Sequence, residues 1–200
     1  MMKPIKLICL FIFIIVVVLF TVGYTSVPIM NSSSTVNINT PTNSNISSLI
    51  TTPNNNNINV IIKFYIDKFT TKDNITNASS SITYESLGGT IAQLFKVLLY
   101  TCISATLLTS SGIIVSFLGL KFISKLVFIL ALLAMILIFS IMIVLITNNI
   151  ISNSIKNLII PNIVGVNISN NTINYDTGFI LMSVATGLMF VNYIIYNYFG

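Results

Sequence analysis

Residues 97–119 read VLLYTCISATLLTSSGIIVSFLG, and residues 126–147, after a link of six residues, read LVFILALLAMILIFSIMIVLIT. Neither stretch contains a charged residue, and each provides the ~20 apolar residues with which a helix crosses ~30 Å of hydrocarbon. Residues 7–24 and 178–198 have a similar length and character. The sequence therefore predicts an all-α membrane protein, built as a four-helix transmembrane bundle.

The composition of the 200-residue chain excludes an ordinary soluble domain, because 54% of the residues are hydrophobic and 6% are charged. The net charge of +5 comes from scattered lysines, without the basic cluster and interleaved aromatic residues of a nucleic-acid-binding surface. The two cysteines, Cys9 and Cys102, both lie in apolar stretches. The loops therefore carry neither a disulfide framework nor a thiolate metal site.

Four lysines predict the orientation of the bundle, because short loops that are rich in lysine stay in the cytoplasm. They precede the first apolar stretch or lie in the link between the second and third: Lys3, Lys6, Lys121 and Lys125. We expect a cytoplasmic N-terminus (1–6), a cytoplasmic turn (120–125) and two outer loops (25–90 and 148–177). Such a chain is expected in the secretory pathway or at the plasma membrane.

Residues 7–24 have two interpretations. Two lysines, an apolar run and the small residues Thr21-Val22-Gly23 form the pattern of a cleaved signal peptide, and the same run left uncleaved is a signal anchor. Cleavage would remove residues 1–23 and leave three spans. Both routes place residues 25–90 outside.

The first outer loop begins with low-complexity sequence, since residues 25–59 are mostly Ser, Thr and Asn. Such a segment cannot bury enough apolar surface to offset its ordering entropy, and we expect most of this loop to be disordered. Residues 60–69 and 159–168 are instead rich in β-branched side chains and predict short strands. These runs could pair as a small outer sheet or lie at the membrane interface.

Six Asn-x-Ser/Thr acceptors for N-glycosylation all fall in the two expected outer loops. They are Asn31, Asn45, Asn74, Asn77, Asn167 and Asn170. Four of these acceptors lie in residues 24–90, and chance alone gives about four there at this content of Asn, Ser and Thr. Their number is therefore no sign of selection. We expect glycosylation most at Asn74 or Asn77, which lie far from the apolar stretches.

A seam of small residues predicts where helices pack, because small side chains let backbones approach closely in lipid. On the second apolar stretch the seam is Cys102, Ala105, Thr109, Gly112, Ser116 and Gly119, with Ile113 off it, and on the fourth it is Ser183 and Gly187. The alternative is that such a seam lines a pore. Other hydroxyls are expected to bond to their own helix, and Asn192 to bond to another helix.

The capping-box spacing of Thr90 and Gln93 predicts a helix over 91–119, about 43 Å long at 1.5 Å per residue. This length exceeds the hydrocarbon core, so the helix should tilt or project beyond it.

The spans lack Asp, Glu, His and Arg, and Lys96 lies at the outer end of one of them. Proton relays, voltage sensors and ion-coupled carriers depend on such groups. We identify no catalytic residue, no metal or cofactor site and no nucleotide-binding motif, and we do not expect an enzyme. The expected function is that of a non-catalytic membrane glycoprotein in the lipid bilayer, which associates with itself or with other membrane proteins. The alternative is a channel or transporter subunit whose pore forms on oligomerisation.

The order of a large outer loop, a tight inner hairpin and a shorter outer loop resembles that of claudin-like and peripheral-myelin-protein-like four-span proteins. The resemblance is one of topology, and we assign no family on it. That family's first loop carries a Trp and a Cys pair, whereas this chain has no Trp and no Cys in a loop.

Overall fold

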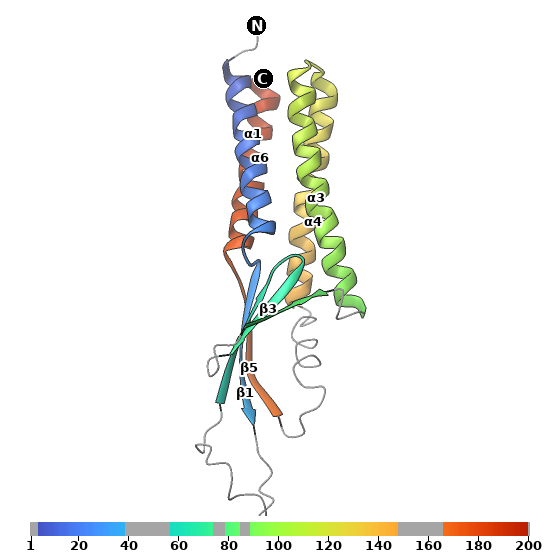
Figure 1. Ribbon diagram of the computed structural model, residues 1–200. Coiled ribbons are helices and arrows are strands. Elements are labelled where there is room, and N and C mark those ends of the chain that lie inside the picture. The colour runs from blue at the N-terminus through green and yellow to red at the C-terminus, as the bar shows by residue number, and fades with distance from the viewer. Residues whose placement is uncertain (1–3, 39–56, 74–78, 85–88, 148–165, 200) are drawn as a thin grey trace, which may run out of the picture.

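The computed structural model describes residues 4–38, 57–73, 79–84, 89–147 and 166–199 (Figure 1). Four helices are long and apolar enough to cross a membrane. The helices are α1 (Pro4–Thr25), α3 (Gly89–Phe117), α4 (Lys121–Thr147) and α6 (Thr177–Phe199). The strands are β1 (Met30–Ile38), β2 (Asn57–Phe64), β3 (Lys68–Asp73), β4 (Ser79–Thr83) and β5 (Val166–Tyr175).

The five strands form one antiparallel sheet in the order β4-β3-β2-β1-β5. The prediction of an all-α protein is therefore wrong for the outer segments, although the four long apolar helices are present as predicted. The expected disorder is also wrong for Met30–Ile38, which is the strand between β2 and β5. Its sequence, MNSSSTVNI, has little strand propensity, but it gains hydrogen-bonded partners on both sides.

The structure divides the run 60–69, for which the sequence predicts a single strand, into the two strands of a hairpin. β2 ends at Phe64, β3 begins at Lys68, and the amide of Tyr65 donates to the carbonyl of Lys68 across the turn (2.8 Å). The other predicted run lies outside the described residues over 159–165 and enters β5 at Val166. β2 and β5 do not pair with each other, because β1 lies between them.

Strand register separates the sheet into an apolar and a polar face, because paired residues point to the same side. Met30, Phe64 and Phe69 are opposite one another and buried. The next row along the strands, Asn31 with Lys63 and Thr70, points to the other face. The apolar face continues into the helices, where Phe69 contacts Tyr84 and the Tyr84 ring stacks on Phe95 of α3 at 3.9 Å.

The bundle consists of two closely packed helix pairs, α1 with α6 and α3 with α4 (Figure 1). At the α1–α6 crossing, a Cβ on Gly178 would lie 2.5 Å from the carbonyl oxygen of Gly23. Only glycine allows two backbones to come this close. Within the other pair, Gly119 (φ +80°) ends α3 in the left-handed conformation that allows a tight turn into α4.

The two ends of the bundle are unlike (Figure 1). The N-terminus, the C-terminus and the turn between α3 and α4 lie together at the end that we call the turn end. The strands continue from α1 and into α6 at the opposite end, which we call the sheet end. All four helices therefore run between the turn end and the sheet end, as crossing one membrane requires.

Candidate functional site

The predicted glycosylation acceptors are distributed unevenly. Asn45, Asn74 and Asn77 lie outside the described residues, and Asn167 and Asn170 lie in β5. Asn31 lies in β1, and its amide nitrogen, the atom that would carry a glycan, donates to Asp176 Oδ2 at 3.1 Å. Asn31 thus already has a structural role on the polar face of the sheet.

The small-residue seam of α3 lies inside the bundle. Its members Cys102, Ala105, Thr109, Gly112 and Ser116 are buried. At Gly112 an added Cβ would lie 2.6 Å from the ring of Phe128 on α4, so this glycine makes room for an aromatic side chain. Gly119 is different, because it is exposed and serves the turn.

The two residues of the seam expected on α6 are not buried, unlike those of α3 inside the bundle. Gly187 is exposed, and a Cβ there would meet nothing within 4 Å. Ser183 bonds to the carbonyl of Phe179 in its own helix. The close approach of α6 occurs instead at Gly178, the second residue of the helix at its sheet end. Ile113, expected off the seam of α3, is also buried.

A buried polar cluster joins all four helices near the turn end, and the sequence did not predict it. Tyr196 of α6 lies within hydrogen-bond distance of Ser116 of α3 (2.6 Å) and of Ser124 of α4 (3.3 Å). Lys6 of α1 donates to the carbonyl of Ser116 (3.5 Å) and lies over the Tyr196 ring (5.9 Å). The amine thus lies at the C-terminus of α3, where the helix dipole favours a cation.

Asn192 makes the interhelical hydrogen bond expected of it. Its side chain is 1% exposed, and Nδ2 donates to the carbonyl of Cys9 on α1 at 2.7 Å. Its Oδ1 has no hydrogen-bond partner in the described part of the chain. The bond ties α1 to α6, and a polar group in hydrocarbon favours such a pairing.

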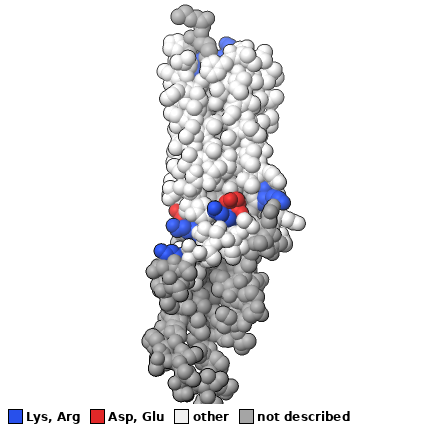
Figure 2. Space-filling view, in the orientation of Figure 1, with Lys and Arg blue, Asp and Glu red and all other residues white. Residues whose placement is uncertain are grey.

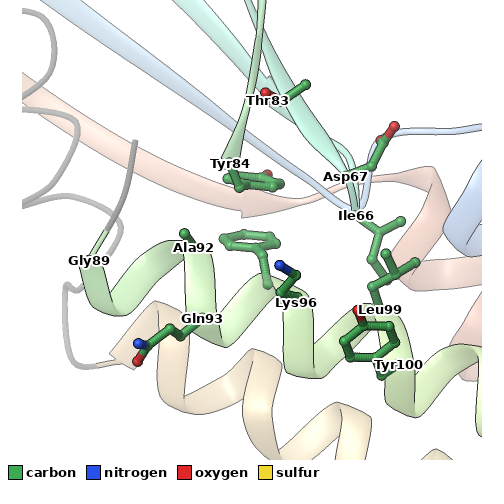
Figure 3. A pocket seen from close by; sticks show the side chains of 11 residues that line it. Ile66, Asp67, Thr83, Tyr84, Gly89, Ala92, Gln93, Lys96, Leu99 and Tyr100 are labelled. Carbon is green, nitrogen blue, oxygen red and sulfur yellow. The ribbon is translucent and has the colours of Figure 1, made fainter. Parts of the chain in front are cut away.

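A cavity of about 540 Å³ lies at the sheet end, between α3 and the strands (Figure 3). Its wall on the strand side comes from Ile66 and Asp67 of the β2–β3 turn and from the end of β4. Its wall on the helix side comes from the first turns of α3, including Lys96. The residues that line it are Ile66, Asp67, Thr83, Tyr84, Gly89, Ala92, Gln93, Phe95, Lys96, Leu99 and Tyr100.

Charged side chains gather around the sheet end. Figure 2 shows blue and red atoms in a belt at the junction of the bundle and the sheet, whereas the sides of the bundle above it are white. Such a belt is typical of the region where a membrane protein leaves the hydrocarbon. Burial raises the pKa of Tyr84 in this region well above its usual value, and the negative charge of Asp67 raises it further.

Asp176 connects the sheet to α6. Its Oδ1 accepts hydrogen bonds from the backbone (2.6 Å) and the hydroxyl (3.2 Å) of Thr177, the first residue of α6. Burial raises the pKa of Asp176, but the hydrogen bonds from Thr177 and Asn31 and the charge of Lys63 outweigh it, and the pKa is lowered. The carboxylate therefore stabilises this junction in its ionised form.

These contacts can position side chains and bind a ligand of mixed polarity. The described residues include no group of three or more His, Cys, Asp or Glu side chains that could hold a metal ion. The chain matches no protein-family model and no curated protein. A function must therefore be argued from the architecture and from the surfaces of the sheet end.

Proposed function

We propose that this chain is a non-catalytic multi-pass membrane glycoprotein that acts by association, through the sheet that it holds at the outer surface of the membrane. The observation that carries the proposal is the rigid attachment of this sheet to the helices. The amide of Gly178 donates to the carbonyl of Pro28, and that of Asp176 to the carbonyl of Ile29, both at 2.9 Å. Tyr175 of β5 also stacks on Phe179 of α6 at 4.0 Å.

Rigid attachment matters because a partner then meets a surface that is already ordered. The two strands at the edges of the sheet are β4 and β5. β4, with the sequence SSSIT, is mostly exposed and carries neither a charge nor a proline, the usual features that prevent pairing with another strand. An edge of this kind can accept a strand of another chain.

Association through the seam of α3 is less well supported, because this seam is filled within the chain. A pore built by oligomerisation would need polar side chains free to face it. The hydroxyls of Thr106, Thr109 and Ser110 bond instead to carbonyls of their own helix, at 2.8–3.0 Å. We therefore prefer association through the sheet to association through the seam of α3 and to a pore.

The packing of α1 supports the interpretation that it is an uncleaved signal anchor, which leaves the protein with four spans. Its buried face includes Phe13, Val16 and Phe20, and its crossing with α6 depends on Gly23, one of the small residues of the candidate cleavage site. Cleavage after Gly23 would remove one member of the α1–α6 pair and expose its apolar partner face. An epitope tag at the N-terminus should therefore remain on the mature protein.

The glycoprotein part of the proposal rests on the acceptors in the outer segments. Asn74 and Asn77 remain the preferred positions, because Asn31 is already bonded within the sheet. Treatment with a glycosidase should increase the gel mobility of the wild-type protein. The same treatment should leave a variant with Gln at both preferred positions unchanged.

The test of association uses a cysteine at the edge of the sheet. The native Cys9 and Cys102 are buried, so Ser81→Cys on β4 would supply the accessible thiol. A short maleimide–diazirine cross-linker, attached to this thiol on intact cells and then irradiated, should convert Ser81→Cys into a discrete larger species, whose mass identifies a second copy or another protein. Ile61→Cys, exposed on the inner strand β2, is the matched control and should stay monomeric.

The two variants distinguish an edge contact from a contact through the polar face. Cross-linking of Ile61→Cys alone would place the partner on the face and overturn the role of β4. The absence of a cross-linked species from both variants would contradict association through the sheet.

A further inference from the structure

The cavity at the sheet end lies at the depth of the lipid headgroups. α3 has 29 residues and is about 43 Å long, against ~30 Å of hydrocarbon. Twenty residues counted back from its end at Phe117 span that hydrocarbon and reach about residue 97. The first turns of α3, which line the cavity, therefore project into the headgroup layer, and Lys96 lies at its boundary.

Two opposite charges reach the cavity from different elements. Lys96 comes from α3, and Asp67 comes from the β2–β3 turn. Figure 3 shows Lys96 and Leu99 on the helix side, with Ile66 and Asp67 on the side of the strands. A zwitterionic headgroup carries the complementary pair, a phosphate and an ammonium.

The cavity also continues into a surface that faces lipid. From Lys96 toward the turn end, the same side of α3 presents Tyr100, Ile103, Leu107 and Ile114, at steps of four, three, four and seven residues that keep one helical face. Their side chains are 59%, 39%, 64% and 61% exposed. An acyl chain lying on this stripe would bring its own headgroup to Lys96.

We propose that this cavity binds the headgroup of a zwitterionic glycerophospholipid. The phosphate pairs with Lys96, the ammonium lies near Asp67, and an acyl chain follows the exposed stripe of α3. The volume of about 540 Å³ lies within the range of small-molecule sites. The cavity touches the end of β4 at Thr83, whereas association rests on the exposed edge of that strand, which a different experiment probes at Ser81, so either proposal can fail without the other.

The experiment measures binding to the purified full chain in maltoside micelles, followed by the rise in unfolding temperature. Dioleoyl phosphatidylcholine should give a saturable rise, dioleoyl phosphatidylglycerol a smaller one, and free phosphocholine at the same concentration none. Lys96→Gln should weaken phosphatidylcholine binding at least about tenfold, since a hydrogen bond to a charged group is lost. Asp67→Asn should weaken phosphatidylcholine binding but not that of phosphatidylglycerol, which has no cation.

Two further variants serve as controls. Lys96→Arg keeps the charge and should retain binding, which separates a loss of the ligand contact from a loss of folding. Lys72→Gln removes an exposed lysine of β3 away from the cavity and should bind as the wild type does. Unchanged phosphatidylcholine affinity in Lys96→Gln would overturn the site. Tighter binding of phosphatidylglycerol would show only a general attraction of anionic lipid, and binding of phosphocholine as tight as that of the lipid would assign a soluble ligand instead.

Discussion

Replacing Gly178 by alanine tests how α1 and α6 cross. The added Cβ would lie 2.5 Å from the carbonyl oxygen of Gly23 and 2.8 Å from that of Pro28. Both neighbours are backbone atoms, which cannot rotate away as a flexible side chain can. An ordinary contact needs about 3.5 Å, so the helices would have to separate by about 1 Å or α6 would have to shift.

The expected cost follows from this overlap. Overpacking of a closely packed contact typically costs about 1–3 kcal/mol. Gly187→Ala on the same helix is the matched control, because its Cβ meets nothing within 4 Å. Alanine at an exposed helical position stabilises by about 1 kcal/mol relative to glycine. The two variants should therefore differ by about 2–4 kcal/mol, with Gly178→Ala the less stable.

Thermal unfolding in detergent, followed by size-exclusion chromatography of the heated samples, measures this difference. For a chain of this size 1 kcal/mol shifts the midpoint by roughly 2–4 °C, so Gly178→Ala should unfold at least roughly 4 °C below Gly187→Ala. Equal midpoints would refute the close crossing at Gly178. A lower midpoint for Gly187→Ala would instead favour the seam that the sequence predicted.

Three further changes test other contacts. Gly112→Leu should promote thermal aggregation in detergent, because the leucine side chain would overlap Phe128. Ile114 is 61% exposed, so the control Ile114→Leu should not promote aggregation. Equal aggregation of the two variants would mean that Gly112 faces lipid. The folded pKa of Asp176 is lowered, so its stabilisation is present above the unfolded value of about 4 and is lost as the pH falls through the folded pKa. Asp176→Asn should flatten the acid side of the curve of unfolding temperature against pH, and an unaltered slope would contradict this. The folded pKa of Tyr84 is raised, so its stabilisation is present below about pH 10 and is lost as the pH rises above that value. Tyr84→Phe should therefore flatten the alkaline side of the curve of unfolding temperature against pH. If the variant loses stability at high pH as the wild type does, this tyrosine is not the source of that loss.

The four helices could be predicted because each is a continuous apolar run, which is a local signal along the chain. The packing within the bundle could be predicted only where one helix carries the pattern by itself. On α3 five of six seam residues are buried, and the sixth, Gly119, serves the turn. On α6 the closest approach is at Gly178, whose partner Gly23 lies more than 150 residues away in sequence. Composition around Gly23 instead indicated a cleavage site.

The sheet was mostly missed for a related reason. β1 is a polar segment with no alternation of apolar residues, and it becomes a strand because β2 and β5 lie on either side of it. The turn at Tyr65–Asp67 lacks the Gly, Pro and Asn that usually mark a hairpin, so β2 and β3 read as one run. Spacing within one segment cannot show such long-range pairings.

The cavity was not predicted, although one of the residues that line it was noted. Lys96 was identified as a lysine at the end of a span, where its charge must reach the headgroup layer. Asp67 lies 29 residues earlier and gave no signal, because it reaches α3 only through the hairpin and the contact of Tyr84 with Phe95. A site made by two elements of different kinds needs the fold before it can be recognised.

The most direct test of the account asks whether the sheet lies outside the cell and the turn end inside it. Single cysteines at Ser81 of β4 and at Leu120 of the α3–α4 turn can be treated with a membrane-impermeant maleimide, since the native cysteines are buried. We predict that Ser81→Cys is labelled on intact cells and Leu120→Cys only after permeabilisation. Labelling of Leu120→Cys on intact cells, with Ser81→Cys protected, would contradict the account.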